Sequence, residues 1–194
     1  MSRGTYLLTH FARQNRIGRT NSSESGDTSP DSSDSPKEKK MILNNELELT
    51  VPEGFHEMDA AERAKLTFAG GEPGLCITDP DRHMIVTVGW RPLGTFAAML
   101  VDAKSAAKTS EKQIGKLMKE YGYRTLGFSG RDLGGKPGEG FRFSYDVQDI
   151  GMLGESIFVK NGKTLYGFNL YCRRALEKES APVLKELLNS VSRV

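Results

Sequence analysis

Apolar and polar residues alternate along several short stretches of this chain, and that pattern predicts strands. Residues 46–51, ELELTV, have the alternation of a half-buried strand. Residues 75–78 and 83–90 are rich in β-branched side chains and predict two more strands. An irregular strand is expected over 123–133, and FRFSYDV at 141–147 alternates clearly. Much of the chain is therefore expected to form a sheet.

A further hairpin is predicted around Asn161-Gly162, the dipeptide most typical of a two-residue turn between strands. It joins residues 154–160 to residues 163–172 and pairs Lys160 with Lys163. In this register Glu155 shares one face of the sheet with apolar side chains only. Those side chains are Ile157, Val159, Tyr166, Phe168 and Leu170.

Helical spacing indicates three helices between and after these strands. Asp59 and Glu62 form a capping-box pattern for a short helix to about residue 66. A long helix is expected over residues 102–121, with a start near residue 95 left open and Gly122 as its C′ residue. Its predicted apolar face comprises Ala103, Ala106, Ala107, Ile114, Leu117, Met118 and Tyr121.

The C-terminal segment predicts the third helix. Ser180 is the expected N-cap, and Pro182 lies in the first turn, where a proline is tolerated. The apolar face comprises Val183, Leu184, Leu187, Leu188 and Val191. The resulting fold class is α+β: a mostly antiparallel sheet covered by a long central helix and a C-terminal helix.

This order of elements resembles a known superfamily. LELTVPEGF at 47–55, the hairpin after it, one long helix and the closing ESIFVKNGKTLYGFNLYCR at 155–173 resemble the PsbP/Mog-type α/β/α fold. That superfamily includes an extrinsic photosystem II subunit, a eukaryotic Ran-binding factor and bacterial domains of unknown function, some of which are chaperones for secreted effectors. The resemblance implies a bacterial binding or accessory protein more often than an enzyme, and it assigns no functional residue here.

Composition divides the chain into a tail and one domain. Residues 21–40 hold seven serines, two prolines and no aliphatic or aromatic residue, so residues 1–40 are expected to be a disordered tail and residues 41–194 a single domain. Residues 1–20 contain four arginines and no acid, which fits either a targeting segment or an extension upstream of a true start at Met41. We expect a cytoplasmic protein.

Charge and apolar content exclude two classes of partner. Residues 41–194 contain 20 basic and 20 acidic side chains, and a neutral body argues against a dedicated nucleic-acid binder. No apolar run approaches the roughly 18 residues of a membrane span. The partner is therefore expected to be a protein or a small ligand, and neither the partner nor the oligomeric state follows from the sequence.

Few residues offer chemistry. Asp79-Pro80-Asp81-Arg82 has the composition of a type I turn, and Asp79 to His83 lack the spacing of a metal loop, so neither a metal nor another cofactor is expected. Cys76 and Cys172 lie 96 positions apart and do not form a disulfide framework. An enzyme using the 79–83 loop or Cys172, which precedes two arginines, remains an alternative.

Two candidate partner-binding sites remain. One is a basic row at four-residue spacing along the long helix. It comprises Lys104, Lys108, Lys112 and Lys116. The other is Glu155, which a three-residue loop at 149–151 would place opposite Tyr145, where the phenol could donate to the carboxylate. The expected function is a non-catalytic binding or accessory domain, with a chaperone or adaptor for an exported protein as the alternative.

Overall fold

The fold is known here from a computed structural model, which describes residues 39–64, 66 and 72–194. The strands are β1 Lys39–Leu43, β2 Leu47–Val51, β3 His56–Glu57, β4 Leu75–Asp79, β5 Met84–Pro92, β6 Arg124–Leu133, β7 Lys136–Val147, β8 Ile150–Asn161, β9 Thr164–Arg173 and β10 Ser192–Arg193. The helices are α2 Ala60–Arg63, α3 Thr95–Leu100, α4 Ala103–Leu117 and α5 Glu177–Asn189, with 3-10 turns η2 Lys119–Tyr121 and η3 Arg174–Leu176. The fold is α+β with mostly antiparallel sheets, as predicted.

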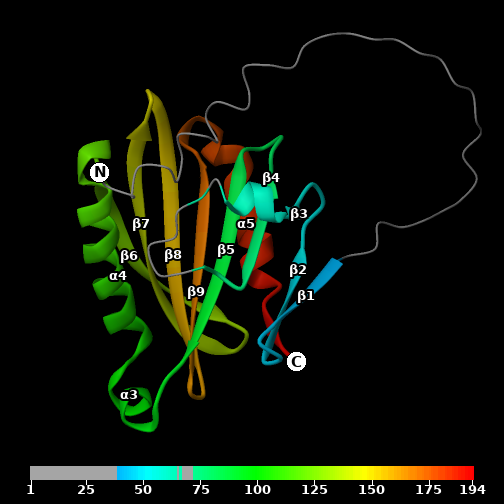
Figure 1. Ribbon diagram of the computed structural model, residues 1–194, viewed down its shortest axis with the longest axis vertical. Coiled ribbons are helices and arrows are strands. Elements are labelled where there is room, and N and C mark those ends of the chain that lie inside the picture. The colour runs from blue at the N-terminus through cyan, green and yellow to red at the C-terminus, as the bar shows by residue number, and fades with distance from the viewer. Residues whose placement is uncertain (1–38, 65, 67–71) are drawn as a thin grey trace, which may run out of the picture.

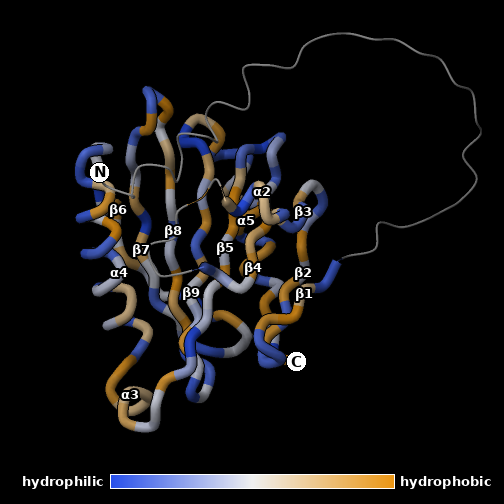
Figure 2. The backbone as a smooth tube through the Cα atoms, in the orientation of Figure 1, coloured by the Kyte–Doolittle hydropathy of each residue, from blue (hydrophilic) through white to orange (hydrophobic). Residues whose placement is uncertain are grey.

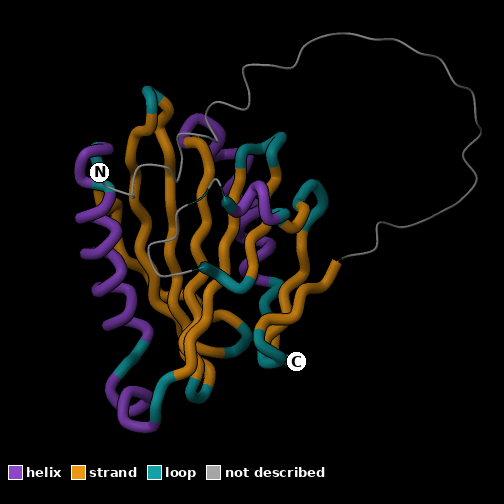
Figure 3. The backbone as a smooth tube through the Cα atoms, in the orientation of Figure 1, coloured by secondary structure: helices purple, strands orange, loops and turns teal. Residues whose placement is uncertain are grey.

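Two sheets build the domain. Seven strands form the larger sheet in the order β3-β4-β5-β9-β8-β7-β6, and β1, β2 and β10 form the smaller one. Figure 1 shows the long strands of the larger sheet at the centre, α4 at one side, and β1, β2 and α5 at the other. Strands dominate the fold, and the helices lie at its flanks (Figure 3). Strand β1 starts at Lys39, two residues before the predicted start of the domain at Met41, and Lys39 pairs with Val51 of β2. Most of the predicted tail lies outside the described residues.

Both faces of the larger sheet are buried at its centre. One face packs on α4 and carries aromatic side chains of β7, including Phe141, Phe143 and Tyr145. The opposite face packs on the smaller sheet and on α5. Its buried side chains include Leu47, Leu49, Val86, Val88, Ile157, Val159, Tyr166, Phe168, Leu187 and Leu188. A strand buried on both faces must be apolar at nearly every position, so its alternation no longer identifies its inner face.

The hairpin between β7 and β8 differs from the predicted one. Its loop has two residues, Gln148 and Asp149, with φ values of 49° and 66°. Positive φ at both central positions is the geometry of a type I′ turn, whose twist suits a hairpin. Tyr145 consequently pairs with Met152, and Glu155 pairs with Arg142. The predicted pairing of Tyr145 with Glu155 is wrong, and the three-residue shift places them on opposite faces.

The hairpin between β8 and β9 is present, with a different turn position. Gly162, with φ of 57°, and Lys163 form the loop, so Asn161 pairs with Thr164 rather than Lys160 with Lys163. Glycine at the first central position is typical of a type II′ turn. The shift from the predicted register is two residues, which preserves the faces. Glu155 therefore does share a face with Ile157 and Tyr166, but its partner on β9 is Leu170.

The helical region after β5 is divided in two. Val101, with φ of −88° and ψ of 122°, leaves the helical region and separates α3 from α4. Asp102 then caps α4, since its carboxylate accepts a hydrogen bond of 2.6 Å from the Ser105 N–H and its own N–H donates to the Ser105 hydroxyl at 3.2 Å. Gly122 adopts the left-handed conformation expected at C′, with φ of 65°. Most of the predicted inner face of α4 is buried, but Leu117 is 49% exposed.

The start of the C-terminal helix was predicted too late. Helix α5 begins at Glu177, with Leu176 at the N-cap position, and Ser180 is a buried residue inside the first turns. A short 3-10 turn leads directly from β9 into α5, so no free N-cap side chain is required for the chain to enter the helix. The predicted apolar face is correct within the helix, since Leu187 and Leu188 are buried, whereas buried Val191 lies beyond the end of α5.

The predicted start of the short helix α2 is correct. Asp59 accepts from the Glu62 N–H at 2.8 Å, and Glu62 accepts from the Asp59 N–H at 3.0 Å. These reciprocal bonds satisfy two backbone donors that the first turn of a helix otherwise leaves free. The helix ends at Arg63, earlier than predicted.

Gly154 tests how tightly the α4 face is packed. A Cβ at this position would lie 2.2 Å from Cζ of Phe143, a ring within an aromatic cluster that also contains Tyr145 and Tyr171. We expect Gly154→Ala to lower the free energy of unfolding by about 1–3 kcal/mol, because the ring cannot move freely. Gly94→Ala is the control, since nothing lies within 4 Å of that position. Urea denaturation measures both, and an equal loss in the two variants would contradict the packing described.

Candidate functional site

The Asp79–His83 loop is a turn. Asp79 pairs with Met84 at the ends of β4 and β5, and the Asp79 carboxylate accepts a hydrogen bond of 3.0 Å from the Arg82 N–H. His83 has φ of 54°, a conformation that histidine tolerates better than most residues. Burial and the charge of Arg173 lower the pKa of its imidazole. The predicted turn is confirmed, and among the described residues no group of three or more His, Cys, Asp or Glu could hold a metal ion.

Asp79 has a structural role in this turn. Its side chain is 1% exposed, and its second oxygen lies 3.3 Å from Nε of Arg82. Arg82 in turn donates to the backbone carbonyl of Glu53 at 3.3 Å. Gly54, with φ of 93°, lies so close that a Cβ there would be 2.7 Å from the Asp79 carboxylate. The carboxylate therefore joins two turns to each other and does not face a cleft.

The two cysteines do not form a reactive centre. Both thiols are free, and both residues are buried, Cys76 at 0% and Cys172 at 6% exposure. Burial raises the pKa of the Cys76 thiol and of the Cys172 thiol. A nucleophilic cysteine needs the thiolate, which a raised pKa disfavours. The arginines after Cys172 do not reverse this effect.

Glu155 and Tyr145 lie in different environments. Tyr145 is completely buried, burial raises its pKa well above the ordinary value, and its hydroxyl has no hydrogen-bond partner among the described residues. Because it is fully buried, the Tyr145 side chain cannot contact a partner molecule. Glu155 lies 3.9 Å from Nη2 of Arg131, while its cross-strand neighbour Arg142 binds Glu177 at 2.6 Å. The charges near Glu155 are thus largely paired within the fold.

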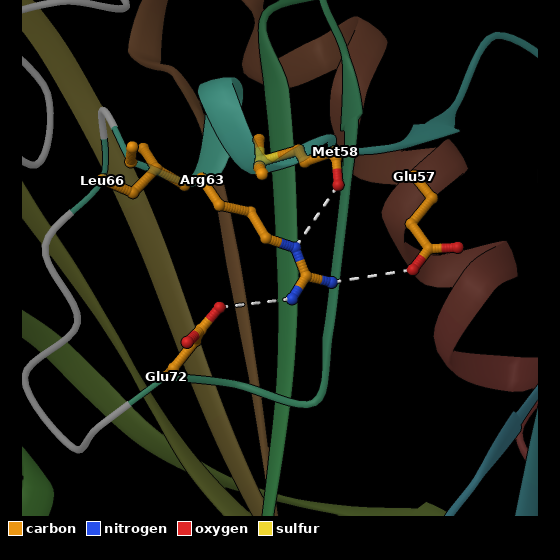
Figure 4. Close-up of a pocket in the computed structure, with 7 residues that line it drawn as sticks. Glu57, Met58, Arg63, Leu66 and Glu72 are labelled. Atoms are coloured by element: carbon orange, nitrogen blue, oxygen red, sulfur yellow. Dashed lines mark hydrogen bonds and ion pairs between the residues drawn. The ribbon is translucent and has the colours of Figure 1, made fainter.

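A shallow depression lies between α2 and the start of β4. It has a volume of about 650 Å³ and is lined in part by Glu57, Met58, Arg63 and Glu72. Figure 4 shows the Arg63 guanidinium reaching between the two carboxylates. It donates to the Met58 carbonyl at 3.3 Å and lies 3.6 Å from each glutamate. Two acids therefore neutralise this arginine, which is the cation among the described residues that line the depression.

The lysine row lies on the outer surface of α4. All four side chains are exposed, whereas Ala103 and Ala107 face the sheet. Strand β6 runs beside this helix, and the Thr125 hydroxyl donates to the Glu111 carboxylate of α4 at 2.5 Å. The structure does not test whether the row binds a partner, and that assignment remains a prediction.

Strand β6 forms one edge of the larger sheet. It pairs with β7 along its length, and among the described residues no strand pairs with its other side. Leu133 is its only buried residue, while Leu126 and Phe128 are 53% and 50% exposed. We refer to β6 together with exposed Leu117 and the lysine row of α4 as the β6 surface.

The sequence did not identify the β6 surface. Residues 123–133 predicted a strand, but Leu126 and Phe128 resemble core positions in such a pattern. A bulge between Thr125 and Gly127, where Gly127 has φ of 153°, changes which side chains face α4. The irregular alternation was the available signal, but it was used only to predict an irregular strand and not to place that strand at an exposed edge.

Comparison with known proteins identifies the fold. Cyanobacterial PsbP (CyanoP) from Synechocystis sp. PCC 6803 is similar with a TM-score of 0.59 and 14% sequence identity, covering 86% of this chain and 98% of that one. The chain has a PsbP-like fold. LpqN, involved in cell envelope biogenesis of Mycobacterium tuberculosis, gives a TM-score of 0.54 at 14% identity and covers 98% of both chains. The expected resemblance is therefore confirmed at the level of structure.

A third structure shares the PsbP-like fold over part of its length. A protein from Bacteroides thetaiotaomicron VPI-5482 gives a TM-score of 0.52 at 11% identity, covering 81% of this chain and 49% of that one. No family model and no curated protein sequence matches this chain. At such low identities the comparisons establish the fold and no reaction, ligand or partner.

Asp79 and Asp81 provide a matched test of the turn. Asp79→Ala removes a buried hydrogen bond and leaves Arg82 without its carboxylate, so we expect it to lower the free energy of unfolding by about 1–3 kcal/mol. Asp81 is exposed, and Asp81→Ala should change stability by less than about 0.5 kcal/mol. Urea denaturation distinguishes the two variants. A larger loss for Asp81→Ala would show that the loop has another role.

Thiol labelling tests the alternative of a cysteine enzyme. Because both thiols are buried and their pKa values are raised, neither should react appreciably with Ellman's reagent at pH 8 in the native protein. Both should react rapidly in guanidinium chloride. Stoichiometric reaction of one thiol in the native state within seconds would contradict the burial described and would restore Cys172 as a candidate nucleophile.

Proposed function

We propose that this chain is a non-catalytic binding protein that holds an extended segment of a partner polypeptide along β6. Strand β6 carries this proposal: it is a ten-residue edge strand with one unpaired side in the described structure. An extended segment can add to such an edge through main-chain hydrogen bonds, while pockets for alternate side chains provide specificity. A cytoplasmic location belongs to the same proposal, since both cysteines are free thiols.

The side chains around β6 indicate the chemistry of the segment. Leu126, Phe128 and Leu117 are each about half exposed and offer apolar contact beside the strand. Leu126 and Phe128 are two positions apart on the strand, and large exposed apolar residues that lie close together are typical of a binding surface. The lysine row on the adjacent helix α4 favours acidic residues in the partner. The preferred segment is therefore one that alternates apolar side chains with aspartate or glutamate.

Of the two alternative functions, only the enzyme fits the described residues less well. A chaperone or adaptor that holds a segment of an exported protein would use the same edge, and it differs only in the identity of the partner. An enzyme would need converging polar groups. In the described structure the Asp79 carboxylate is engaged within the turn and both thiols are buried.

Glu155 is not part of the β6 surface. Phe128 pairs with Phe141 on one face of the sheet, and Glu155 lies on the opposite face, so it would form a second contact site.

Photocrosslinking in cells tests whether a polypeptide lies against β6. Phe128 is replaced by p-benzoylphenylalanine, a conservative change because the ring already lies at the surface beside Phe141. Irradiation should link this position to one dominant polypeptide. The control places the same residue at Ile42 of β1, which is 59% exposed but lies on the smaller sheet. Crosslinks confined to Ile42, or only to a second copy of this chain, would contradict the proposal.

The affinity for the captured segment is then measured with purified protein. Phe128→Lys should weaken it by at least about tenfold, since a charge replaces an apolar contact and discourages strand addition. Ile42→Lys should leave the affinity within about twofold. Isothermal titration calorimetry compares the two variants with the unaltered protein. Equal affinities would show that the segment binds elsewhere.

A further inference from the structure

Helix α3 exposes apolar side chains that a soluble domain normally buries. Its sequence is TFAAML, and none of its residues is buried. Phe96, Met99 and Leu100 are 77%, 79% and 67% exposed, whereas the small residues Ala97 and Ala98 are partly covered. The amphipathic order of an ordinary surface helix is thus reversed. Figure 2 shows α3 as an apolar turn at the extreme end of the molecule, next to the β8–β9 hairpin.

The segment is held in place from both sides. Before the helix, Leu93 is buried and its N–H donates to the Lys163 carbonyl at 2.6 Å. Within the helix, the Lys160 ammonium donates to the Ala98 carbonyl. Both anchors belong to the β8–β9 hairpin, which is continuous with the core of the larger sheet. The three apolar side chains are therefore presented by a fixed support rather than by a loose loop.

Basic residues surround this apolar turn. Residues 91–104 and 160–164 contain four basic side chains, Arg91, Lys104, Lys160 and Lys163, and one acid. That acid, Asp102, caps α4 by accepting the Ser105 N–H. Glu46 also lies near the hairpin, but its carboxylate accepts hydrogen bonds from Asn161, Thr164 and Tyr166. Four basic side chains against the two carboxylates of Asp102 and Glu46 leave this end of the molecule positive, although residues 41–194 as a whole are neutral.

We propose that α3 docks the protein onto an anionic membrane surface. Phe96, Met99 and Leu100 enter the boundary between headgroups and acyl chains, and the exposed side chains of Arg91, Lys104 and Lys163 contact acidic headgroups. A short apolar element flanked by cations is the chemistry of interfacial binding, where apolar insertion and electrostatic attraction add. No helix in the described part of the chain is long and apolar enough to cross a bilayer.

This proposal does not depend on the β6 surface. A polypeptide partner would need a complementary groove or strand, but α3 presents only one and a half turns and no unpaired strand edge. A bilayer accepts such a small apolar projection without shape complementarity. The charge pattern also matches acidic lipids, which form an extended sheet of negative charge rather than a single point.

Vesicle sedimentation with the full chain tests the proposal. Vesicles of phosphatidylcholine mixed with an equal part of phosphatidylglycerol should sediment the protein, and phosphatidylcholine alone should not. The triple variant Phe96→Gln, Met99→Gln, Leu100→Gln should lose binding by about tenfold or more, because the apolar insertion is removed while the charges remain. Its thermal melting should match that of the unaltered protein, since none of the three residues is buried. The matched control is Phe128→Gln, which changes the β6 surface and should leave vesicle binding intact.

A labelled variant distinguishes insertion from simple electrostatic contact. Both native cysteines are buried, so Met99→Cys can carry an environment-sensitive fluorophore selectively. Anionic vesicles should shift its emission to the blue, and Ile42→Cys should show no shift. Absence of vesicle binding, equal binding by the triple variant, or equal binding to neutral vesicles would overturn the proposal. Concentration-dependent self-association that the triple variant abolishes, without vesicle binding, would assign α3 to an interface between copies of the chain instead.

Discussion

Coverage of both faces of the seven-stranded sheet is the constraint on which this structure depends. Helix α4 packs on one face, and the smaller sheet with α5 packs on the other. Strands β7, β8 and β9 must therefore place side chains of suitable size on both sides. Gly154 leaves room for the Phe143 ring on the α4 side, and Gly140 leaves room for Ile157 on the other. Glycine is required at these two positions because a Cβ there would overlap a large side chain of the neighbouring strand. An interior packed to the density of a crystal tolerates neither overlap nor voids.

The same coverage explains which parts of the sheet could be predicted from the sequence. The predicted strands and the hairpin around Asn161-Gly162 follow from local signals and are present, whereas β1, β3 and β10 were not predicted. The β7–β8 register was assigned from a three-residue loop with Gly151 in its third position, supported by the assumption of one apolar face. The loop has two residues instead, and the assumption fails for strands buried on both sides. With Phe141 and Tyr145 packed under α4 and Ile157 under α5, two registers satisfy the apolar pattern equally well. Turn geometry decides between them, and Gln148 and Asp149 at positive φ were not an obvious choice.

Local capping rules were more reliable than the inference of a site. The Asp59 capping box and the left-handed Gly122 follow from a few adjacent residues, so no tertiary information was needed. Glu155 required the register, and its predicted partner Tyr145 lies on the other face. The α5 start was misplaced because a 3-10 turn continues directly from β9, which a search for a capping side chain cannot detect. A site predicted from pairing across strands is wrong whenever the predicted register is wrong.

Two groups of exposed apolar side chains, on α3 and on β6, do not contribute to covering the faces of the larger sheet. Ile42 and Val194 are single exposed side chains, and isolated apolar residues on a surface are normal. Phe96, Met99 and Leu100 instead project together from a helix whose alanines face inward, at a positively charged end of the molecule. Leu126 and Phe128 lie on an edge strand that no described element covers. Folding alone gives no reason to retain large apolar side chains at either place, since glutamine or lysine would serve the same helix or strand equally well. A partner that removes them from water does give such a reason. The two groups differ in support, charge and shape, so one is suited to a flat acidic surface and the other to an extended chain.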